Sequence, residues 1–431
     1  MISSSNPVKG TLNPETINRE GLVPQRYDLT NGRPVYLFFD KHIDIVRIDF
    51  IFDCGTAHQD KFLQTASAIR LLTAGTSRHT ARQIAEFVDF RGIVFDSRCD
   101  SVSSSLTVYC LSRYLVEFLP LLQECLVDAS YPQEEFDIFV SKRRQALETA
   151  ALKPSHVARC NFYKGLYGSS HPLGRFATVD DVDRLSVEDT RRYYRQYLVP
   201  SRMTILLGGN VPEGTLDLID KLFGSAVTEP YQPLSLPTPQ PGEEREIRLP
   251  MPNAVQSALR VGRLLPFDWS DVEYARFMVL NTVLGGYFGS RLMTNIREDK
   301  GYTYGIYSQT QIYRGSMAFY IFSEVAASKA DAALQEIRNE IDRLCNEPVG
   351  IDELQMVQSS MVGDFIRGID GVFERMERFS NMFVCGVTEL FTDNLLGVIK
   401  QGGISPSELL ETAQRVLSYD NMLVVSAGPM A

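Results

Sequence analysis

The chain has 431 residues, of which 44% are hydrophobic and 22% are charged, and its net charge is −10 at pH 7. A chain of this length exceeds what one hydrophobic core supports, so we expect a globular protein of at least two domains. The acidic balance argues against a nucleic-acid-binding surface, which requires clustered basic residues, and favours an ordinary solvated surface.

The cysteines and the start of the chain bear on the compartment. Seven cysteines are scattered without a C-x-x-C pair, which favours free thiols in a reducing compartment over a disulfide framework or a zinc ribbon. Residues 1–21 lack the pattern of a signal peptide, and no stretch reaches the length of about 18 apolar residues that a membrane span requires. We therefore expect a cytoplasmic protein with no membrane contact; a leader removed beforehand is the alternative.

Three stretches in the first half of the chain have counterparts, in the same order, in the second half. Residues 103–126 and 315–341 each read as an alternating strand that runs into an amphipathic helix, and residues 131–147 and 349–365 each read as a turn followed by a helix. Residues 185–209 align without a gap with 404–428, where a serine opens a helix that leads to a buried strand. Chance similarity between amphipathic elements is the alternative, but three matches in one order favour duplication.

A proline-rich segment separates the two halves. Five prolines fall between Pro230 and Pro241, and proline continues neither a helix nor a central strand. We predict a first domain at 1–224, a linker at 225–245 and a second domain at 246–431. The predicted fold class is α/β (α+β), with two duplicated domains that each contain a mostly antiparallel sheet covered by helices.

Several segments resemble one peptidase family. The stretches DFIFDCGTAHQD (49–60), AGTSRHTARQIAEFVDFRGIVFDS (74–97) and GSSHPLGR (168–175), together with 185–209, are similar to the surroundings of the zinc helix in pitrilysin-type inverted-zincin metallopeptidases. The resemblance runs from about residue 20 to the end of the chain. It points to the short bacterial and mitochondrial-processing-peptidase-like members, and it implies half of a clamshell that encloses a peptide.

The zinc motif H-x-x-E-H of this family is missing. When the sequences are aligned on the Gly-Thr pair at 75–76, the first histidine falls at Ala66, the catalytic glutamate at Ile69 and the second histidine at Arg70. The third metal ligand, a glutamate, falls close to Glu148. Alanine, isoleucine and arginine neither bind a metal nor act as a general base. The segments around the site therefore resemble the family, but the metal ligands and the general base are absent.

The loss of the motif predicts that this chain holds no zinc and no other cofactor. Catalytic zinc needs three protein ligands, and the five histidines show no substitute pair at i, i+4 spacing. We expect zinc in a partner chain instead. We also predict that Arg70 forms an ion pair with Glu148, because an orphaned carboxylate buried at a former metal site would be costly.

The second half retains a different part of the family pattern. The segment GGYFGSRLMTNIREDKGYTYGIYS, residues 285–308, is similar to a family segment in which an arginine and a tyrosine seven residues apart contact the substrate peptide. Here these residues are Arg297 and Tyr304, and Gly301 allows the turn between them. The resemblance implies that Arg297 binds a peptide carbonyl and that Tyr304 stabilises the oxyanion. Alternatively, Arg297 pairs with an adjacent acid at a solvated helix end and Tyr304 is an ordinary strand aromatic.

A chain that lacks the zinc ligands and keeps the Arg/Tyr pair resembles the non-catalytic subunit of a heterodimeric zinc peptidase. Its expected partners are an H-x-x-E-H subunit of the same family and a peptide or unfolded polypeptide, and it would complete the partner's active site in trans. Two alternatives remain: a purely structural scaffold subunit, and a stand-alone peptide-binding clamshell, a homodimer if no partner exists.

Overall fold

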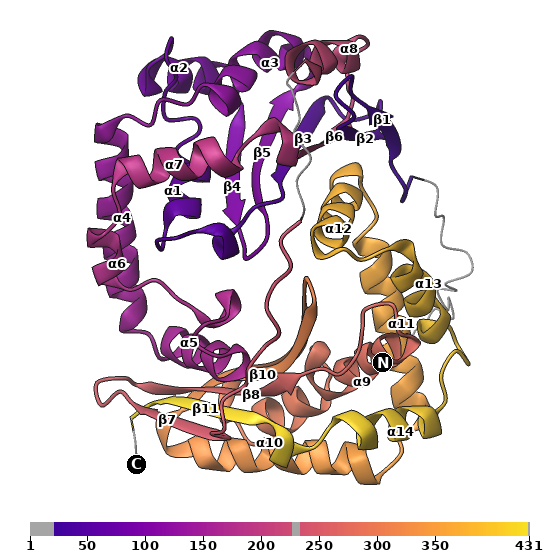
Figure 1. The fold of residues 1–431 in the computed structure, drawn as a ribbon. Coiled ribbons are helices and arrows are strands. Elements are labelled where there is room, and N and C mark those ends of the chain that lie inside the picture. The colour runs from indigo at the N-terminus through magenta and orange to yellow at the C-terminus, as the bar shows by residue number, and fades with distance from the viewer. Residues whose placement is uncertain (1–20, 226–232, 430–431) are drawn as a thin grey trace, which may run out of the picture. The chain divides into compact units, whose positions relative to one another are not determined.

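The computed structural model describes residues 21–225 and 233–429. Its contacts divide the chain into two units, which are shown as ribbons in Figure 1. The first unit consists of Gly21–Glu244 and Gly371–Gly386, and the second of Arg245–Asp370 and Val387–Ala431. Part of the predicted linker, residues 226–232, lies outside the described residues.

The first unit contains a mixed sheet of six strands in the order β1-β2-β6-β3-β5-β4. Neighbouring strands are antiparallel except for the parallel pair of β2 and β6. The strands are β1 (Gln25–Asp28), β2 (Pro34–Phe39), β3 (Ile45–Phe52), β4 (Val94–Cys99), β5 (Ser104–Leu111) and β6 (Met203–Gly209).

The second unit repeats this topology in a sheet of five strands, in the order β7-β11-β8-β10-β9. Its one parallel pair, β7 with β11, stands where β2 and β6 stand in the first sheet. The strands are β7 (Glu246–Pro250), β8 (Gln256–Leu264), β9 (Thr303–Tyr313), β10 (Ser316–Ala326) and β11 (Leu423–Gly428). The predicted α/β class with two mostly antiparallel, duplicated sheets is therefore confirmed.

Helices complete both units. The first unit contains α1 (Gln64–Arg70), α2 (Ala81–Arg91), α3 (Ser112–Val127), α4 (Gln133–Ala151), α5 (Pro154–Tyr167), α6 (Val179–Asp183), α7 (Val187–Tyr197), α8 (Thr215–Ile219) and α12 (Val372–Cys385). The second unit contains α9 (Val272–Asn281), α10 (Ala330–Asn346), α11 (Ile351–Arg367), α13 (Glu389–Ile399) and α14 (Pro406–Val416). A π-helical segment, Met293–Asp299, precedes β9.

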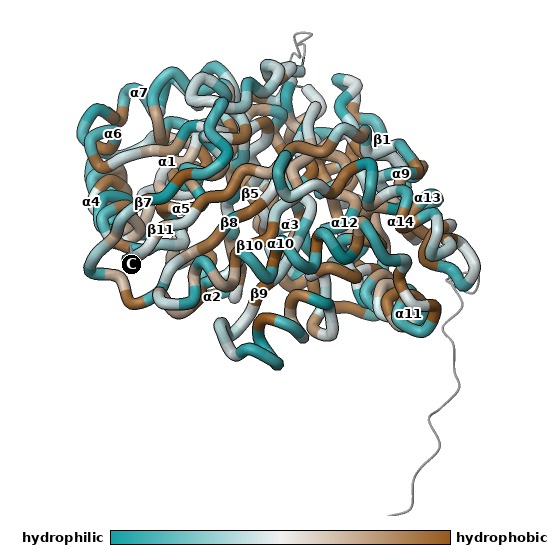
Figure 2. Tube along the Cα trace, turned by 90° about the horizontal axis from the view of Figure 1, so that it is seen from below, coloured by the Kyte–Doolittle hydropathy of each residue, from teal (hydrophilic) through white to brown (hydrophobic). Residues whose placement is uncertain are grey.

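The main core of the first unit lies between the sheet and helices α1, α2, α3 and α7. Every residue of β6 is buried, and the buried side chains of the central strand β3 include Ile48 and Phe50. Figure 2 shows the central strands β5, β8 and β10 as hydrophobic segments, whereas helices such as α12 alternate between hydrophilic and hydrophobic residues. This contrast is expected when strands are buried on both sides and helices on one.

Helix α12 belongs to the first unit although it lies in the second half of the sequence. Its side chains Val372 and Met376 pack on Phe38, Ile51 and Leu206, which point away from the main core. The close approach requires Gly208 in β6: a Cβ atom at that position would lie 2.0 Å from the sulfur of Met376. The predicted second domain, 246–431, thus includes a helix whose contacts are with the first unit.

The described part of the predicted linker runs along the first unit. The backbone N–H groups of Gln240 and Gly242 donate to the carbonyls of Tyr167 (3.1 Å) and Gly165 (2.9 Å) at the end of α5. The imidazole of His171 lies 3.0 Å from the carbonyl oxygen of Pro237. Hydrogen bonds of this kind fix the path of an extended segment that forms no sheet of its own.

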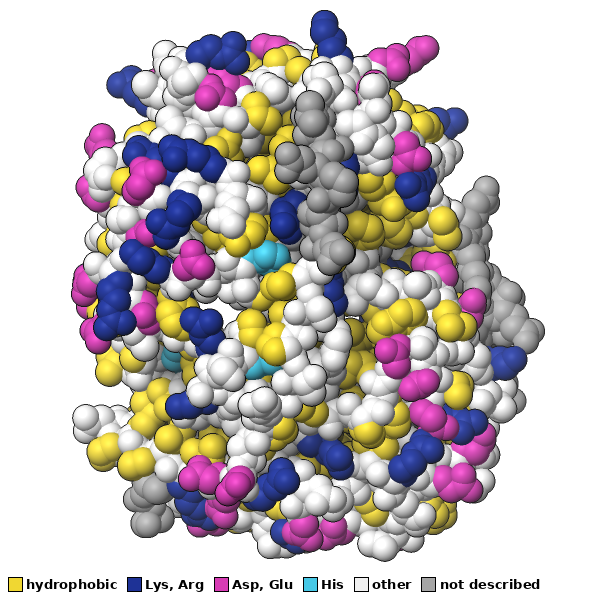
Figure 3. Space-filling view, in the orientation of Figure 1, with side chains coloured by type: hydrophobic (Ala, Val, Ile, Leu, Met, Phe, Trp, Pro, Cys, Tyr) yellow, Lys and Arg dark blue, Asp and Glu magenta, His cyan; other side chains and the backbone are white. Residues whose placement is uncertain are grey.

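On the face shown in Figure 3, acidic and basic side chains are interspersed, without a large patch of one sign. Among the described residues, no single helix is long and apolar enough to cross a membrane.

Candidate functional site

Helix α1, which carries the degenerate motif, is held by buried polar contacts. The side-chain oxygen of Gln64 accepts hydrogen bonds from the backbone N–H groups of Asp60 (2.8 Å) and Lys61 (2.9 Å) ahead of the helix. The hydroxyls of Ser67 and Thr190, the latter in α7, lie 2.7 Å apart. These contacts tie the helix, which has no side-chain cap at its N-terminus, to the preceding loop and to α7.

Two residues with a strained backbone adjoin this helix: one precedes it in the chain, and the other reaches it through a hydrogen bond. Leu63 directly before α1 has φ +71°, and Tyr131 has φ +50°; no other described residue except glycine has a positive φ. Both side chains are buried, and the Tyr131 hydroxyl donates to the carbonyl of Ala68 at 3.0 Å. Strained backbone of this kind persists where packing fixes it, and it clusters at functional sites.

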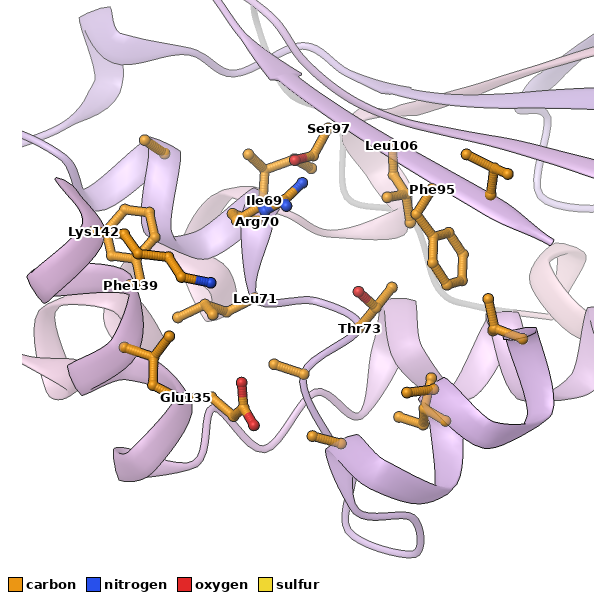
Figure 4. A pocket seen from close by; sticks show the side chains of 18 of the residues that line it. Ile69, Arg70, Leu71, Thr73, Phe95, Ser97, Leu106, Glu135, Phe139 and Lys142 are labelled. Atoms are coloured by element: carbon orange, nitrogen blue, oxygen red, sulfur yellow. The ribbon is translucent and has the colours of Figure 1, made fainter. Parts of the chain in front are cut away.

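The three degenerate motif positions lie at one pocket. Ala66, Ile69 and Arg70 line a pocket with a volume of about 1160 Å³, formed by α1, α2, α4 and the edge strand β4 (Figure 4). Arg70 is exposed, Ala66 is half-buried and Ile69 is buried. The motif positions therefore still face a cavity, but they present a methyl group, a branched alkyl chain and a guanidinium instead of metal ligands.

Helix α4 contributes a regular stripe to this pocket. Its lining residues are Glu135, Ile138, Phe139, Lys142, Arg143 and Ala146. They recur every three or four residues, so they share one face of the helix. Figure 4 shows Phe139 and Lys142 on this helix beside the α1 residues Ile69 and Arg70.

The predicted ion pair between Arg70 and Glu148 is wrong. Both side chains are exposed, and the structure contains no ion pair between them. Glu148 is outside the pocket lining. Because consecutive helical residues are about 100° apart, Glu148 lies about 150° round α4 from the centre of the lining stripe. Its carboxylate keeps its water, so the desolvation cost that motivated the prediction does not arise.

The turn after α1 is anchored by a buried carboxylate. Glu124 of α3 contacts Arg78 (2.5 Å), His79 (2.8 Å) and the hydroxyl of Thr76, and its side chain is 4% exposed. Burial alone would raise the pKa of Glu124, but the hydrogen bonds from Thr76 and His79 outweigh it and hold the pKa below its usual value. Glu124 thus stays ionised and fixes the Gly75–Thr76 turn on which the family pattern was aligned.

Metal ligands are not gathered at this pocket. Within residues 21–225 and 233–429, no three His, Cys, Asp or Glu side chains are placed as metal ligands would be. The side chains at the motif positions do not fit a zinc ion, because none of the three offers a lone pair. That the protein holds no zinc stays a prediction.

In the second unit, Tyr304 is 92% exposed, and the structure gives its hydroxyl no hydrogen-bond partner among the described residues. The guanidinium of Arg297 lies 4.4 Å from the ring centroid of Phe288, and 4.0 Å from the carboxylate of Glu298. No hydrogen bond or cation–π contact joins Arg297 and Tyr304 in the structure. Gly301, at φ +63°, makes the turn between them as predicted.

A β-bulge determines how Tyr304 is presented. In the pairing of β9 with β10, Thr303 is opposite Val325 and Ile306 is opposite Ser323, so Tyr304 and Gly305 together oppose the single residue Glu324. The hydroxyl of Ser323 donates to the carbonyl of Gly305 at 2.9 Å and closes the bulge. Bulges turn a side chain away from the regular alternation and are common beside active sites.

Several residues that line the pocket are not among the site residues predicted from the sequence. Lys142, Phe139 and Arg143 belong to a helix that was recognised, and its i, i+3, i+4 pattern could have identified them as one face. The bulge at Tyr304 and the two positive φ values leave no comparable trace, since they depend on the pairing of strands and on packing.

The chain is similar in sequence and in fold to proteins of the M16 peptidase type. The family profile described as "Peptidase M16 inactive domain" matches residues 184–361. An uncharacterized zinc protease, YmxG of Bacillus subtilis, is 23% identical over 361 residues, covering 82% of this chain and 86% of the relative. A "non-peptidase homolog YmxG" of Helicobacter pylori is 20% identical and covers 77% of each chain. A crystal structure of a peptidase M16 inactive domain from Pseudomonas fluorescens has a TM-score of 0.83 at 18% identity, covering 95% of this chain and 98% of that one.

Proposed function

We propose that the chain is an inactive-type member of the M16 peptidase family and the non-catalytic subunit of a heterodimeric zinc peptidase. In this proposal it binds the peptide substrate and completes the active site of a partner chain that carries H-x-x-E-H. The observation that carries the proposal is the exposed Tyr304, presented by a bulge at a sheet edge in a chain whose own motif helix bears no catalytic group.

The chemistry assigned to this chain is limited to binding and charge stabilisation. A tyrosine hydroxyl with no internal partner is free to donate to the oxyanion that forms when a peptide carbonyl is attacked. The Arg297 guanidinium, supported on the ring of Phe288, would hold a neighbouring carbonyl of the peptide. No step involves a metal in this chain, because its motif residues do not fit one.

A second candidate function is peptide binding without catalysis, and the pocket beside α1 favours it. Strand β4 ends the first sheet, and in the part of the chain that the structure describes it pairs only with β5. A free strand edge beside a largely apolar pocket suits an extended peptide, whose backbone adds to the edge while its side chains enter the pocket. A homodimer would serve this function if no partner chain exists.

Reconstitution tests the proposal. The chain alone, an H-x-x-E-H chain found in a stable complex with it, and their mixture are assayed on a library of fluorogenic peptides, and zinc is measured by elemental analysis. We expect no stoichiometric zinc and no cleavage with the chain alone, and faster cleavage in the mixture than with the partner alone. One tightly held zinc per chain, or a partner whose rate is unchanged by this chain, would contradict the proposal and favour a scaffold.

The proposed location is the cytoplasm. All seven cysteines are free thiols in the structure, and burial raises the pKa of Cys54 and Cys110 to about 12, which makes these thiols poor nucleophiles. Thiols of this kind suit a reducing compartment. Fractionation of cells that produce the full-length protein would test this location.

A further inference from the structure

The pocket beside α1 carries positive charge that its own side chains do not neutralise. Arg70, Lys142 and Arg143 line it with exposed side chains. Among the described residues none of these three cations has a carboxylate partner. A fourth cation, Arg82, is paired with Glu86 at 2.7 Å in the next turn of α2. The three unpaired cations come from two different helices and meet at one cavity.

Two carboxylates also line the pocket, and neither neutralises these cations. Asp89 on α2 and Glu135 on α4 make no ion pair with them. Glu135 lies in the first turn of α4, where the helix dipole already favours a negative charge. The lining therefore retains an excess of positive charge, located where Arg70 and Lys142 enter the pocket in Figure 4.

Between the cations the lining is apolar. The floor and walls include Ile69, Leu71, Ile84, Phe95 and Phe139. A purely polar anion would leave this surface in contact with water, and a purely apolar ligand would leave the cations without a counter-charge. The complementary ligand carries apolar groups and at least one carboxylate within the length of the pocket.

We propose that this pocket selects peptide segments in which an acidic side chain is flanked by apolar ones. The inference rests on the proposed peptide-binding function and deepens it by naming the class of sequence. Arg70 occupies the position where the family pattern has its second histidine, so a guanidinium attracts a peptide carboxylate where the metal site has been lost. The adjacent edge of β4 offers unpaired backbone groups, which favours a peptide over a free organic acid.

Matched peptides test the proposal on the full-length chain. Three fluorescein-labelled decapeptides share an alanine, valine and leucine background and carry two residues that are Glu, Gln or Lys. By fluorescence anisotropy at low salt, we expect the Glu peptide to bind about tenfold more tightly than the Gln peptide, and the Lys peptide most weakly. The gap should shrink as NaCl screens the exposed cations.

Substitutions assign the preference to this pocket. The double variant Arg70→Gln, Lys142→Gln should lose the gap between Glu and Gln peptides, and Arg70→Glu, Lys142→Glu should prefer the Lys peptide. Lys153→Gln, an exposed lysine just after α4 and outside the lining, is the matched control and should keep the gap. The substituted side chains are exposed, and thermal unfolding will verify that the variants fold.

The outcomes separate this inference from the function on which it rests. If wild-type chain binds the Glu and Gln peptides equally, the acid preference is wrong and peptide binding stands. If the gap survives the double substitution, the preference arises elsewhere and the assignment to this pocket is wrong. If no peptide binds, both peptide binding and its selectivity are overturned.

Discussion

The two units use corresponding segments of the duplication in different ways. In the first unit, α2 ends before Gly92 (φ +62°) and the edge strand β4 begins at Val94. In the second, the π-helical segment ends before Gly301 (φ +63°) and the edge strand β9 begins at Thr303. Counted from these glycines, Tyr304 stands where Phe95 stands. Phe95 lines the pocket beside α1, whereas Tyr304 is almost fully exposed.

The difference arises from backbone geometry as well as from residue type. Strand β4 pairs with β5 in regular register, so Phe95 keeps the alternation that directs it to the pocket. Strand β9 has a bulge at Tyr304 and Gly305, which breaks that alternation. The helical parts also differ, since the π-helix spaces its side chains differently around the axis. A duplicated segment thus forms a cavity wall in one unit and an outward-facing tyrosine in the other.

The largest expected effect concerns the outward-facing tyrosine. Tyr304→Phe removes a hydroxyl from an exposed ring, so folding and assembly with a partner should be preserved. We expect kcat of the reconstituted complex to fall by roughly a hundredfold or more, as for loss of one oxyanion donor. Tyr307→Phe, on the same strand beyond the bulge, is the control and should keep kcat. An unchanged kcat for Tyr304→Phe would remove this residue from the active site.

The pocket of the first unit permits a test of the α4 assignment. Ala66→His with Arg70→His restores two imidazoles one turn apart, but Glu148 faces away from them. Adding Ala146→Glu places a carboxylate on the lining face and supplies a third ligand. We expect zinc affinity about a hundredfold higher for the triple than for the double variant, measured by isothermal titration calorimetry. Equal affinities would mean that Glu148 reaches the metal after all.

Arg297→Ala separates binding from turnover in the second unit. A guanidinium that holds a ground-state carbonyl contributes uniform binding, so KM of the reconstituted complex should rise about tenfold with little change in kcat. Arg343→Ala, which removes a surface arginine that pairs with Glu347 on α10, is the control. If KM stays at its wild-type value, the stacking of Arg297 on Phe288 is structural only.

Asp189→Asn tests the support of the motif helix. Burial alone would raise the pKa of Asp189, but hydrogen bonds from Lys61 and Ser186 outweigh it and hold the pKa well below its usual value. The stability gained is therefore present above the unfolded-state pKa of about 3.9 and is lost as the pH falls toward the folded-state pKa. We expect Asp189→Asn to lower the free energy of unfolding by about 1.5 kcal/mol at pH 7 and by less at pH 3.

Urea unfolding followed by circular dichroism at the two pH values measures this effect. The exposed Asp217→Asn is the control: Asp217 has no ion pair within the described part of the chain, so this change should have little effect at either pH. A loss that is equally large at pH 3 would show that the carboxylate's charge is not what stabilises α7 and, through Thr190, the motif helix α1.

The smallest effect concerns α12, the helix that the first unit takes from the second half of the sequence. Glu377 pairs with Arg47 (2.7 Å) and Arg98 (2.9 Å), and the Arg47 side chain is only 7% exposed. Glu377→Gln should lower the free energy of unfolding by about 1 kcal/mol, because Glu377 is partly exposed and its pairing is screened. Glu374→Gln, an exposed position on the same helix, should have no measurable effect in the same urea titration.

Much of the fold could be predicted because its signals are local. The repeated strand-to-helix and serine-capped patterns at 185–209 and 404–428 are sufficient to indicate duplication, and the strand orders confirm it. The loss of the metal motif at Ala66, Ile69 and Arg70 is likewise a matter of residue identity, as is the turn at Gly301. These features depend on residues that lie within one helical turn or one strand of each other, so the order of residues in the sequence is sufficient to predict them.

Other features were decided only by tertiary structure. Which face of α4 meets α1 depends on how two helices pack, so the sequence could not place Glu148 outside the pocket or Lys142 inside it. The bulge at Tyr304 depends on the register between β9 and β10, and the assignment of α12 to the first unit depends on the packing of Val372 and Met376 against that sheet. The physical reason is common to all three. Packing and strand pairing bring together residues that are far apart in the chain, and the local hydrophobic pattern does not specify which distant residues come into contact.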